Sequence, residues 1–320
     1  MKIFVTRNIP TAGIEKLKAA GHEVTVSDKN DALTQSELIE RLKDLNPDAV
    51  LCLLTDKIDA ATFDAAPNAK VFANYAVGFD NIDLEEAKKR NIITTNTPGV
   101  LTEAVAEHAA ALILTIGRRI VESDDFLRND KYKGWDPMLL LGIELKDKTL
   151  GIVGCGRIGQ RLAEIMKNGF GMKIIYNDQN RNESLETGLA AEFHELDSLL
   201  READVVSIHL PATEETAHLF NKDNLAKMKH SALLINTARG SIIDEAALVE
   251  ALKGKTIAGA ALDVFEDETS VNRDLASLTN IVLTPHIASA TLEAREQMSI
   301  IAADNVISVL NNQPPQNPVM

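Results

Sequence analysis

The stretch TLGIVGCGRIG, residues 149–159, decides how this chain folds. It starts as an apolar run typical of a buried β-strand and ends in the pattern G-x-G-x-x-G. A helix pattern follows over residues 160–167, and the next strand pattern ends at Asp178, about 20 residues beyond the glycines. A strand, a glycine loop, a helix and a following acidic residue together predict a Rossmann dinucleotide-binding domain.

Each part of this stretch has its own physical role. Gly154 allows a tight turn, Gly156 lets the backbone approach a pyrophosphate, and Gly159 lets the helix pack closely on the strand. The N-terminus of that helix attracts the phosphate charge. Asp178 can accept both ribose hydroxyls of the adenosine and its charge would repel a 2′-phosphate, so the pattern predicts NAD rather than NADP. The alternative, a glycine-rich turn beside a solvated aspartate, leaves the flanking strand and helix unexplained.

The sequence on both sides of this stretch alternates between strand and helix patterns. Each connection between parallel strands needs a dozen or more residues, so this alternation predicts parallel sheets joined by helices. We therefore expect an α/β protein with two doubly wound parallel-sheet domains, one a Rossmann domain and the other flavodoxin-like, with a ligand cleft between them. The expected strands are residues 2–6, 23–27, 49–54, 70–76 and 92–96, and then 149–153, 173–177, 204–209, 232–236, 257–263 and 281–284.

Helix patterns fill the intervals between these strands. A long Ala-rich pattern covers residues 102–128, with Thr102 as its N-cap and Glu103 where the helix dipole favours negative charge. It separates the two series of strands, so we place the domain boundary near Pro98. The other expected helices include residues 12–20, 35–45, 83–90 and 292–310.

Composition narrows the class of protein. At 320 residues the chain exceeds the size of a single growing core, and its 45% hydrophobic and 25% charged residues are ordinary for a globular protein. A net charge of −14 argues against a nucleic-acid partner, which would need clustered Lys and Arg. Cys52 and Cys155 suggest neither a disulfide framework nor a metal site, which favours a reducing, cytoplasmic setting.

Targeting and membrane segments are not expected. The chain enters a strand pattern directly at Lys2, without a basic leader. The longest apolar stretch, residues 104–116, is interrupted by Glu107 and His108 and is too short to span a bilayer. We therefore expect a soluble protein.

Three strand patterns of the second half are followed by side chains suited to catalysis. Arg239 follows residues 233–236, Glu268 follows 260–263, and His286 follows 281–284. Open parallel sheets carry their sites at these carboxyl ends. Each residue has an ordinary alternative, since Arg239 could be a surface residue, Glu268 part of an acidic turn, and His286 a helix cap. All three on separate strand ends favour a site.

These side chains suit the reduction of a 2-keto acid. The planar guanidinium of Arg239 can hold the substrate carboxylate and polarise the carbonyl. His286, if protonated, can donate a proton to the carbonyl oxygen as hydride arrives from nicotinamide. We expect Glu268 to orient the imidazole ring and raise the pKa of His286.

The chain resembles the D-isomer-specific 2-hydroxyacid dehydrogenase family over essentially its whole length. The matching stretches are residues 77–83, 154–159, 236–240, 262–268 and 285–289. The resemblance implies that Arg239, Glu268 and His286 are catalytic and that backbone amides at Val77 and Gly78 bind the substrate carboxylate. It also implies cofactor contacts at Thr102, Gly154, Gly156, Arg157, Ile158, Gly159, Asp178, Thr237, Ala238, Asp263, His286 and Ser289.

The same resemblance implies the organisation of the molecule. A substrate domain would be built from residues 1–98 and 290–320, and an NAD-binding domain from residues 99–289. A homodimer would form through the long helix after Pro98. One departure is visible, because the family usually has proline where this chain has Thr269, which could loosen the turn beyond Glu268.

Within the family the resemblance is to glyoxylate/hydroxypyruvate reductases, through residues 52–56 and 135–138. Leu54 would line the pocket, and Trp135 would either close the partner's site or pack at an interface. D-Lactate-type and phosphoglycerate dehydrogenases are alternatives, although the chain ends at Met320 without a regulatory domain. A formate dehydrogenase would have glutamine at Glu268. An NAD-sensing corepressor and an amino-acid dehydrogenase are less favoured, since no basic surface, recruitment segment or catalytic lysine is found.

Overall fold

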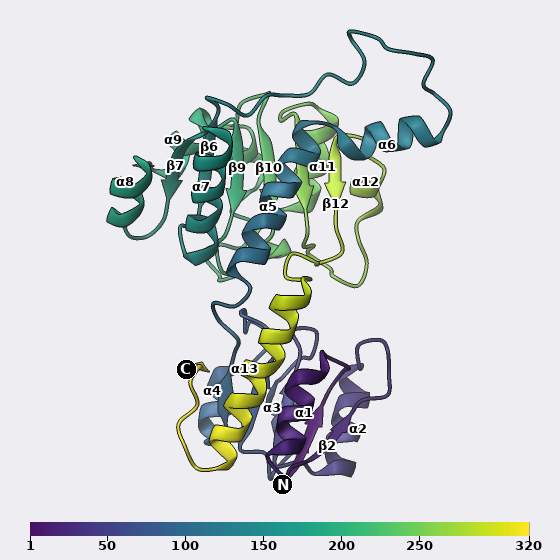
Figure 1. Ribbon diagram of the computed structural model, residues 1–320, viewed down its shortest axis with the longest axis vertical. Coiled ribbons are helices and arrows are strands. Elements are labelled where there is room, and N and C mark those ends of the chain that lie inside the picture. Colours follow the sequence, from purple (N-terminus) through teal and green to yellow (C-terminus); the bar gives the residue numbers. More distant parts are fainter. Residues whose placement is uncertain (320) are drawn as a thin grey trace. The chain divides into compact units, whose positions relative to one another are not determined.

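The computed structural model describes residues 1–319, so Met320 lies outside the described residues, and the chain divides into two units (Figure 1). Unit 1 combines Met1–Leu101 with Ala290–Met320, and unit 2 is the continuous segment Thr102–Ser289. Each unit is a sheet of mainly parallel strands covered by helices. Both predicted sheets are therefore present, and the α/β, doubly wound fold class is confirmed.

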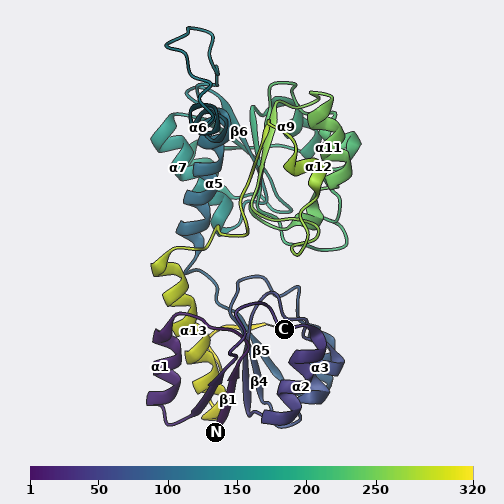
Figure 2. The same cartoon turned by 90° about the vertical axis from the view of Figure 1, so that its right-hand side faces the viewer.

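Unit 1 is built on a six-stranded sheet with the order β13-β5-β4-β3-β1-β2. Five strands run parallel, while the short β13, which no sequence pattern predicts, pairs antiparallel with β5. Helices α1 and α13 cover one face, and α2 and α3 the other (Figure 2). The elements are β1 Lys2–Val5, α1 Thr11–Ala19, β2 Glu23–Val26, α2 Gln35–Leu45, β3 Ala49–Cys52, α3 Ala60–Ala65, β4 Val71–Asn74, α4 Leu84–Lys89, β5 Ile93–Thr95, α13 Leu292–Leu310 and β13 Pro318–Val319.

The last helix packs on the first. A Cβ placed on Gly13 of α1 would lie 2.2 Å from the carbonyl oxygen of Ser299 on α13, so only glycine permits this approach. The Gly13 N–H also donates to Ser299 Oγ at 3.1 Å. The two ends of the chain therefore share one core, although more than 200 residues separate these helices along the sequence.

Unit 2 is built on a seven-stranded parallel sheet with the order β12-β11-β10-β9-β6-β7-β8. Helices α5 and α7 pack on one face and α9 and α11 on the other (Figure 2). The elements are α5 Thr102–Gly117, α6 Ile120–Arg128, β6 Thr149–Val153, α7 Arg157–Phe170, β7 Lys173–Asn177, α8 Glu183–Leu189, β8 Glu192–Phe193, α9 Leu196–Glu202, β9 Val205–Ile208, α10 Lys222–Leu225, β10 Leu233–Asn236, α11 Glu245–Lys253, β11 Gly259–Leu262, α12 Arg273–Ala276 and β12 Ile281–Leu283.

The single helix predicted over residues 102–128 is wrong, because it is two helices. Helix α5 ends at Gly117 and α6 begins after Arg119, whose φ of 53° is left-handed. The Gly117 carbonyl accepts a hydrogen bond from the Ile143 N–H at 2.9 Å, so the segment before β6 replaces the next helical turn. Thr102 is the first helical residue rather than the residue before the helix.

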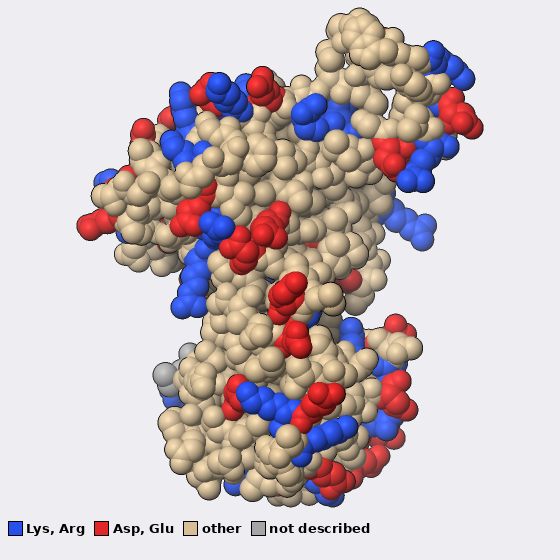
Figure 3. Space-filling view, in the orientation of Figure 1, with Lys and Arg blue, Asp and Glu red and all other residues tan. Residues whose placement is uncertain are grey.

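The helices and the charged side chains of the surface are relevant to binding of membranes and nucleic acids. Among residues 1–319, no helix combines the length and apolar character needed to cross a bilayer. On the face shown in Figure 3, acidic and basic side chains are intermingled within each unit.

Candidate active site

The glycine loop lies between β6 and α7, where each glycine meets a different constraint. Gly154 has a φ of +93°, and a Cβ there would lie 2.7 Å from the His209 carbonyl carbon. A Cβ on Gly159 would lie 2.3 Å from the Gly154 carbonyl oxygen, because α7 packs closely on the end of β6. Gly156 has nothing within 4 Å of its Cβ position. The loop is therefore tight at both ends and open in the middle, where a ligand can approach the backbone.

The N-terminus of α7 faces this open side of the loop. Gly156 precedes the helix, no side chain caps it, and the first helical hydrogen bond runs from Gln160 N–H to the Gly156 carbonyl. The N–H groups of Arg157 and Ile158 thus remain available to an anion. Thr237, just after β10, has a buried hydroxyl with no hydrogen-bond partner within residues 1–319. These uncommitted donors fit a dinucleotide with a pyrophosphate.

Asp178 lies at the carboxyl end of β7, where the glycine loop holds its carboxylate. Oδ2 accepts the Cys155 N–H at 2.6 Å, and Oδ1 accepts the Gln179 N–H at 2.7 Å. These two hydrogen bonds fix the carboxylate beside the loop. Burial, together with the charge of Asp178, raises the pKa of the Cys155 thiol to about 12, so this cysteine stays protonated.

The nearest basic side chain in this part of the sequence is committed elsewhere. Arg181 donates to Glu186 through two hydrogen bonds of 3.1 Å. Its guanidinium also lies 5.6 Å from the centre of the Phe193 ring. This arrangement leaves Asp178 without a bridging cation on that loop.

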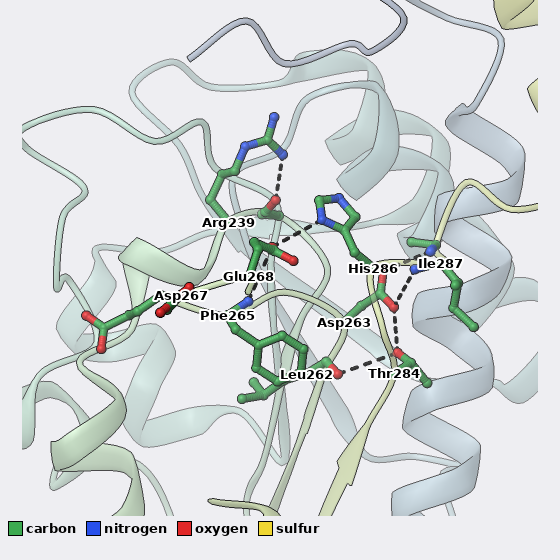
Figure 4. Close-up of polar contacts among 12 residues, drawn as sticks. Arg239, Leu262, Asp263, Phe265, Asp267, Glu268, Thr284, His286 and Ile287 are labelled. Carbon is green, nitrogen blue, oxygen red and sulfur yellow. Dashed lines mark hydrogen bonds and ion pairs between the residues drawn. The ribbon is translucent and has the colours of Figure 1, made fainter. Parts of the chain in front are cut away.

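Arg239, Glu268 and His286 follow β10, β11 and β12, three neighbouring strands of the sheet of unit 2, and their side chains gather at its carboxyl edge (Figure 4). Nδ1 of His286 lies 3.1 Å from Oε1 of Glu268. One guanidinium nitrogen of Arg239 donates to the Ala238 carbonyl at 2.7 Å. Gly240 brings the first two loops together, since a Cβ there would lie 1.9 Å from the Phe265 carbonyl. The structure thus brings the three predicted side chains together.

Asp263 lies behind the histidine and is fully buried. Its carboxylate accepts the Thr284 hydroxyl at 2.6 Å and the N–H groups of Ile287 and Ala288 at 2.9 and 2.8 Å (Figure 4). His108 Nε2 on α5 lies 3.3 Å away. Burial alone would raise the pKa of Asp263, but these donors outweigh it and hold the pKa below its usual range. We call Asp263, His108, Thr284 and the two amides the carboxylate network.

The carboxylate network fixes an unusual backbone conformation. His286 has a φ of +53°, a left-handed value that is uncommon for a residue other than glycine. Its N–H donates to the carbonyls of Asp263 at 2.9 Å and Thr284 at 3.1 Å. Such strain persists only where the surroundings determine the conformation, and it presents the His286 ring to Glu268.

Thr269 does not loosen the turn beyond Glu268. The Asp267 carboxylate accepts both the Thr269 N–H at 2.9 Å and its hydroxyl at 2.6 Å, and these bonds close the turn. Glu268 Oε1 also lies 3.4 Å from the Phe265 N–H, at the long limit of a hydrogen bond. Proline would offer neither the N–H nor the hydroxyl, so this chain stabilises the turn by other means.

The predicted carboxylate-binding residues belong to unit 1. Val77 and Gly78 follow β4, and within residues 1–319 neither N–H donates a hydrogen bond to the protein. Leu54 lines a surface cavity of about 380 Å³ together with Asp80 and Asn81. Trp135, in unit 2, is 83% exposed. The remaining predicted cofactor contacts, Thr102, Ala238 and Ser289, are half-buried residues of unit 2.

Several residues that hold these loops are not predicted from the sequence. Asn74 ends β4, Asn96 follows β5 and His209 follows β9, so the strand-end pattern that singled out Arg239 also marks them. His108 has a weaker signal, a polar residue next to Glu107 within an Ala-rich helix. Desolvation lowers the pKa of His209 to about 4, so its ring is neutral, and its backbone carbonyl packs against Gly154.

Known proteins are similar to this chain over its full length. Residues 110–288 match the family model described as "D-isomer specific 2-hydroxyacid dehydrogenase, NAD binding domain". A glyoxylate reductase from Thermofilum pendens is 51% identical over 317 residues, which is 98% of this chain and 93% of that protein. A protein from Thermus thermophilus superposes with a TM-score of 0.93 at 43% identity and covers 100% of both chains. An NADPH-dependent glyoxylate/hydroxypyruvate reductase from Sinorhizobium meliloti, solved with NADP and malonate, has a TM-score of 0.85 at 33% identity and covers 99% of this chain and 96% of its own.

Proposed function

The chain belongs to the D-isomer specific 2-hydroxyacid dehydrogenase family, and from this premise we propose that it uses NADH to reduce glyoxylate or hydroxypyruvate. It is a nicotinamide-dependent oxidoreductase that converts 2-keto acids to 2-hydroxy acids. The product would be the D isomer wherever it is chiral. The observation that carries the proposal is the His286–Glu268 pair beside Arg239, at the carboxyl edge of a sheet with a dinucleotide loop.

The roles of the three side chains follow from their hydrogen bonds. When bound, the nicotinamide cofactor supplies the hydride that reduces the keto carbon. Glu268 Oε1 would accept a hydrogen bond from His286 Nδ1–H, which would leave Nε2–H as the donor to the carbonyl oxygen. Arg239 would hold the carboxylate of the substrate and polarise its carbonyl. His286, held by the carboxylate network, would therefore be the acid, and Glu268 its orienting partner.

The substrate carboxylate would also be bound by the N–H groups of Val77 and Gly78. Two backbone amides without protein acceptors suit a carboxylate, because charge-assisted hydrogen bonds are about twice as strong as neutral ones. Leu54 would limit the size of the group on the keto carbon, which favours a small substrate. Trp135 of one subunit would help to close the active site of the partner subunit.

The preference for NADH rests on Asp178. The amides of Cys155 and Gln179 hold its carboxylate where the ribose hydroxyls would bind, and a 2′-phosphate would meet that charge. Arg181, which follows Asp178 on this loop, is paired with Glu186. In this proposal the cofactor is bound by unit 2, Thr102–Ser289, through the glycine loop, Arg157, Ile158, Asp178, Thr237, Ala238, Asp263, Ser289, Thr102 and His286.

Coenzyme preference is tested by kcat/KM for NADH and NADPH with glyoxylate. We expect NADH to be favoured, and Asp178→Ala to lower the ratio of NADH to NADPH efficiency by at least about tenfold, or 1.4 kcal/mol. The matched control is Asp223→Ala, a carboxylate on α10 outside the loop. Wild-type preference for NADPH would contradict the assignment of Asp178.

Substrate and acid are tested by following NADH absorbance with glyoxylate, hydroxypyruvate, pyruvate, phenylpyruvate and phosphohydroxypyruvate. We expect the first two to be the best substrates. His286→Ala should lose most of kcat while NADH still binds, and the exposed His230→Ala should retain wild-type activity. Absence of turnover with all five acids would refute the proposed reaction.

A homodimer is the proposed assembly. Helix α6 and the segment after it extend away from the rest of unit 2 (Figure 1), and they expose large apolar side chains. These are Ile120, Val121, Leu127, Tyr132, Trp135, Met138 and Leu141. An apolar surface of this kind marks an interface between proteins. Light scattering should give twice the mass of one chain, and a monomer would contradict the proposal.

The two free cysteines, Cys52 and Cys155, suit a reducing cytoplasm.

A further inference from the structure

We propose that Asn74, Asn81 and Asn96 position the loop of Val77 and Gly78, and thereby set the affinity for the 2-keto acid. They would act through the backbone and not by touching the substrate. The inference rests on the proposed function, in which the N–H groups of this loop bind the substrate carboxylate. All the contacts that carry it lie within unit 1.

The carbonyl groups of the loop fix the direction of its N–H groups. In a trans peptide the C=O of one residue points opposite to the N–H of the next. The Ala76 carbonyl accepts the Thr97 N–H at 2.9 Å, so the Val77 N–H points the other way. The Val77 carbonyl accepts Asn96 Nδ2 at 2.8 Å, which turns the Gly78 N–H to the same free side.

Asn74 holds the far end of the loop. Its side chain is fully buried, and Nδ2 donates to the Gly78 carbonyl at 2.8 Å and to Asn81 Oδ1 at 3.0 Å. A carboxamide has two N–H donors, and both are used here. The Gly78 carbonyl therefore cannot rotate without leaving a buried donor unpaired, which costs about 1–3 kcal/mol.

Asn81 joins this loop to the turn that carries Leu54. Its Nδ2 donates to the carbonyls of Leu53 and Asp56, both at 3.0 Å. The turn is held from its other side by the buried Asp56 carboxylate, which accepts the Leu53 N–H at 2.8 Å. Because the amides of Asn74 and Asn81 are fully used, a shift of the Val77–Gly78 loop would also disturb Leu54.

The test compares Asn81→Ala and Asn96→Ala with Asn280→Ala. Asn280 is the matched control, because its amide also donates to two backbone carbonyls, those of Leu252 and Ala258, but it lies in unit 2 just before β12. For each variant we would measure KM and kcat for glyoxylate and hydroxypyruvate, the Kd for NADH and the melting temperature.

We expect Asn81→Ala to raise KM for glyoxylate about tenfold and to change the ratio of kcat/KM between the two acids. Asn96→Ala removes one bond to the loop and should raise KM about threefold. NADH affinity should stay within about twofold of wild type in both. Asn280→Ala should lower the melting temperature without changing KM.

The outcomes separate this inference from the proposed function. If the wild-type protein reduces neither acid, the proposed function fails. If it does, and both asparagine variants keep KM within about twofold while they lose stability, the three residues are merely structural and the inference is overturned. If Asn81→Ala does not fold, Asn96→Ala decides, because it affects only the Val77 carbonyl.

Discussion

Two loops of this protein follow parallel strands, yet they are held by different chemistry. The loop of Val77 and Gly78 in unit 1 is fixed by neutral carboxamides, of which Asn74 is fully buried. The loop of residues 284–288 in unit 2 is fixed by the buried carboxylate of Asp263. The difference follows from the conformation that each loop must keep.

The loop in unit 2 is strained, whereas the loop in unit 1 is not. His286 has a φ of +53°, a conformation that costs about 1–3 kcal/mol, while neither Val77 nor Gly78 has a positive φ. A buried carboxylate is expensive to desolvate, but each hydrogen bond to it contributes about 1.5–3 kcal/mol against about 1 for a neutral bond. Charge is thus used where a strained residue must be held, and amides suffice where the backbone is relaxed.

Removal of the Asp263 side chain should cause the largest loss of stability. Asp263→Ala leaves the N–H groups of Ile287 and Ala288 without this acceptor and the Thr284 hydroxyl with only a long contact to the Leu262 carbonyl, so we expect unit 2 to lose about 3–5 kcal/mol of unfolding free energy. Asn74→Ala in unit 1 should cost only about 1–3 kcal/mol. Urea unfolding of both variants provides the measurement. Equal losses would show that charge is no more important than neutral amides here.

The pH dependence of stability should also differ between the two units. Desolvation keeps the pKa of His209 at about 4, whereas in the unfolded chain it is about 6.5, so below pH 6.5 the unfolded state binds the proton first. Unit 2 should therefore lose stability as the pH falls from 6.5 to 4, by up to about 2 kcal/mol between pH 7 and 5. His209→Asn should remove this slope in urea unfolding. An unchanged slope would assign it to other groups.

Asp263 extends this loss into more acidic solution. Its pKa is held below the usual range, so its contribution is present above the unfolded pKa of about 3.9 and is lost as the pH falls through the folded value. The amides of unit 1 do not titrate. The variant Asn74→Ala should therefore differ from wild type by the same amount at each pH.

The hydrogen bond between Asn74 and Asn81 should have a smaller effect on stability. Asn74 and Asn81 share a hydrogen bond of 3.0 Å, so a double-mutant cycle should give a coupling energy of about 1 kcal/mol. The cycle between Asn81 and Asn280, which share no partner, should give a value near zero. Additive effects of Asn74→Ala and Asn81→Ala would show that the two residues act independently.

Most of the fold follows from the sequence, because strand and helix patterns alternate with clear periodicity. The pattern misses β8 and β13, each two residues long, since so short a strand has no periodicity of its own. It also misses the break between α5 and α6. Gly117 was a local signal, but the hydrogen bond from Ile143, distant in sequence, ends the helix.

The candidate site, like the fold, is only partly predictable from the sequence. Arg239, Glu268 and His286 are marked by strand ends, and the resemblance to a family assigns their roles. Their supports depend on tertiary contacts, as His108 shows, because it lies about 155 residues before Asp263 in the sequence and 3.3 Å from it in the structure. Asn74 and Asn96 lie at strand ends too, and the same rule applied to the first half of the chain would have found them.

The turn after Glu268 tests whether every loop of unit 2 depends on a buried charge. It is closed by exposed bonds from Thr269 to Asp267, and Glu268 has its own contact with His286. Thr269→Pro would lose these bonds but would restrict the unfolded chain, two effects of similar size. We therefore expect a change of at most about 0.5 kcal/mol and a kcat within about twofold of wild type, with Thr269→Ala as the control that keeps the N–H. A tenfold loss of kcat in Thr269→Pro alone would mean that this turn, like the His286 loop, must be held rigidly for catalysis.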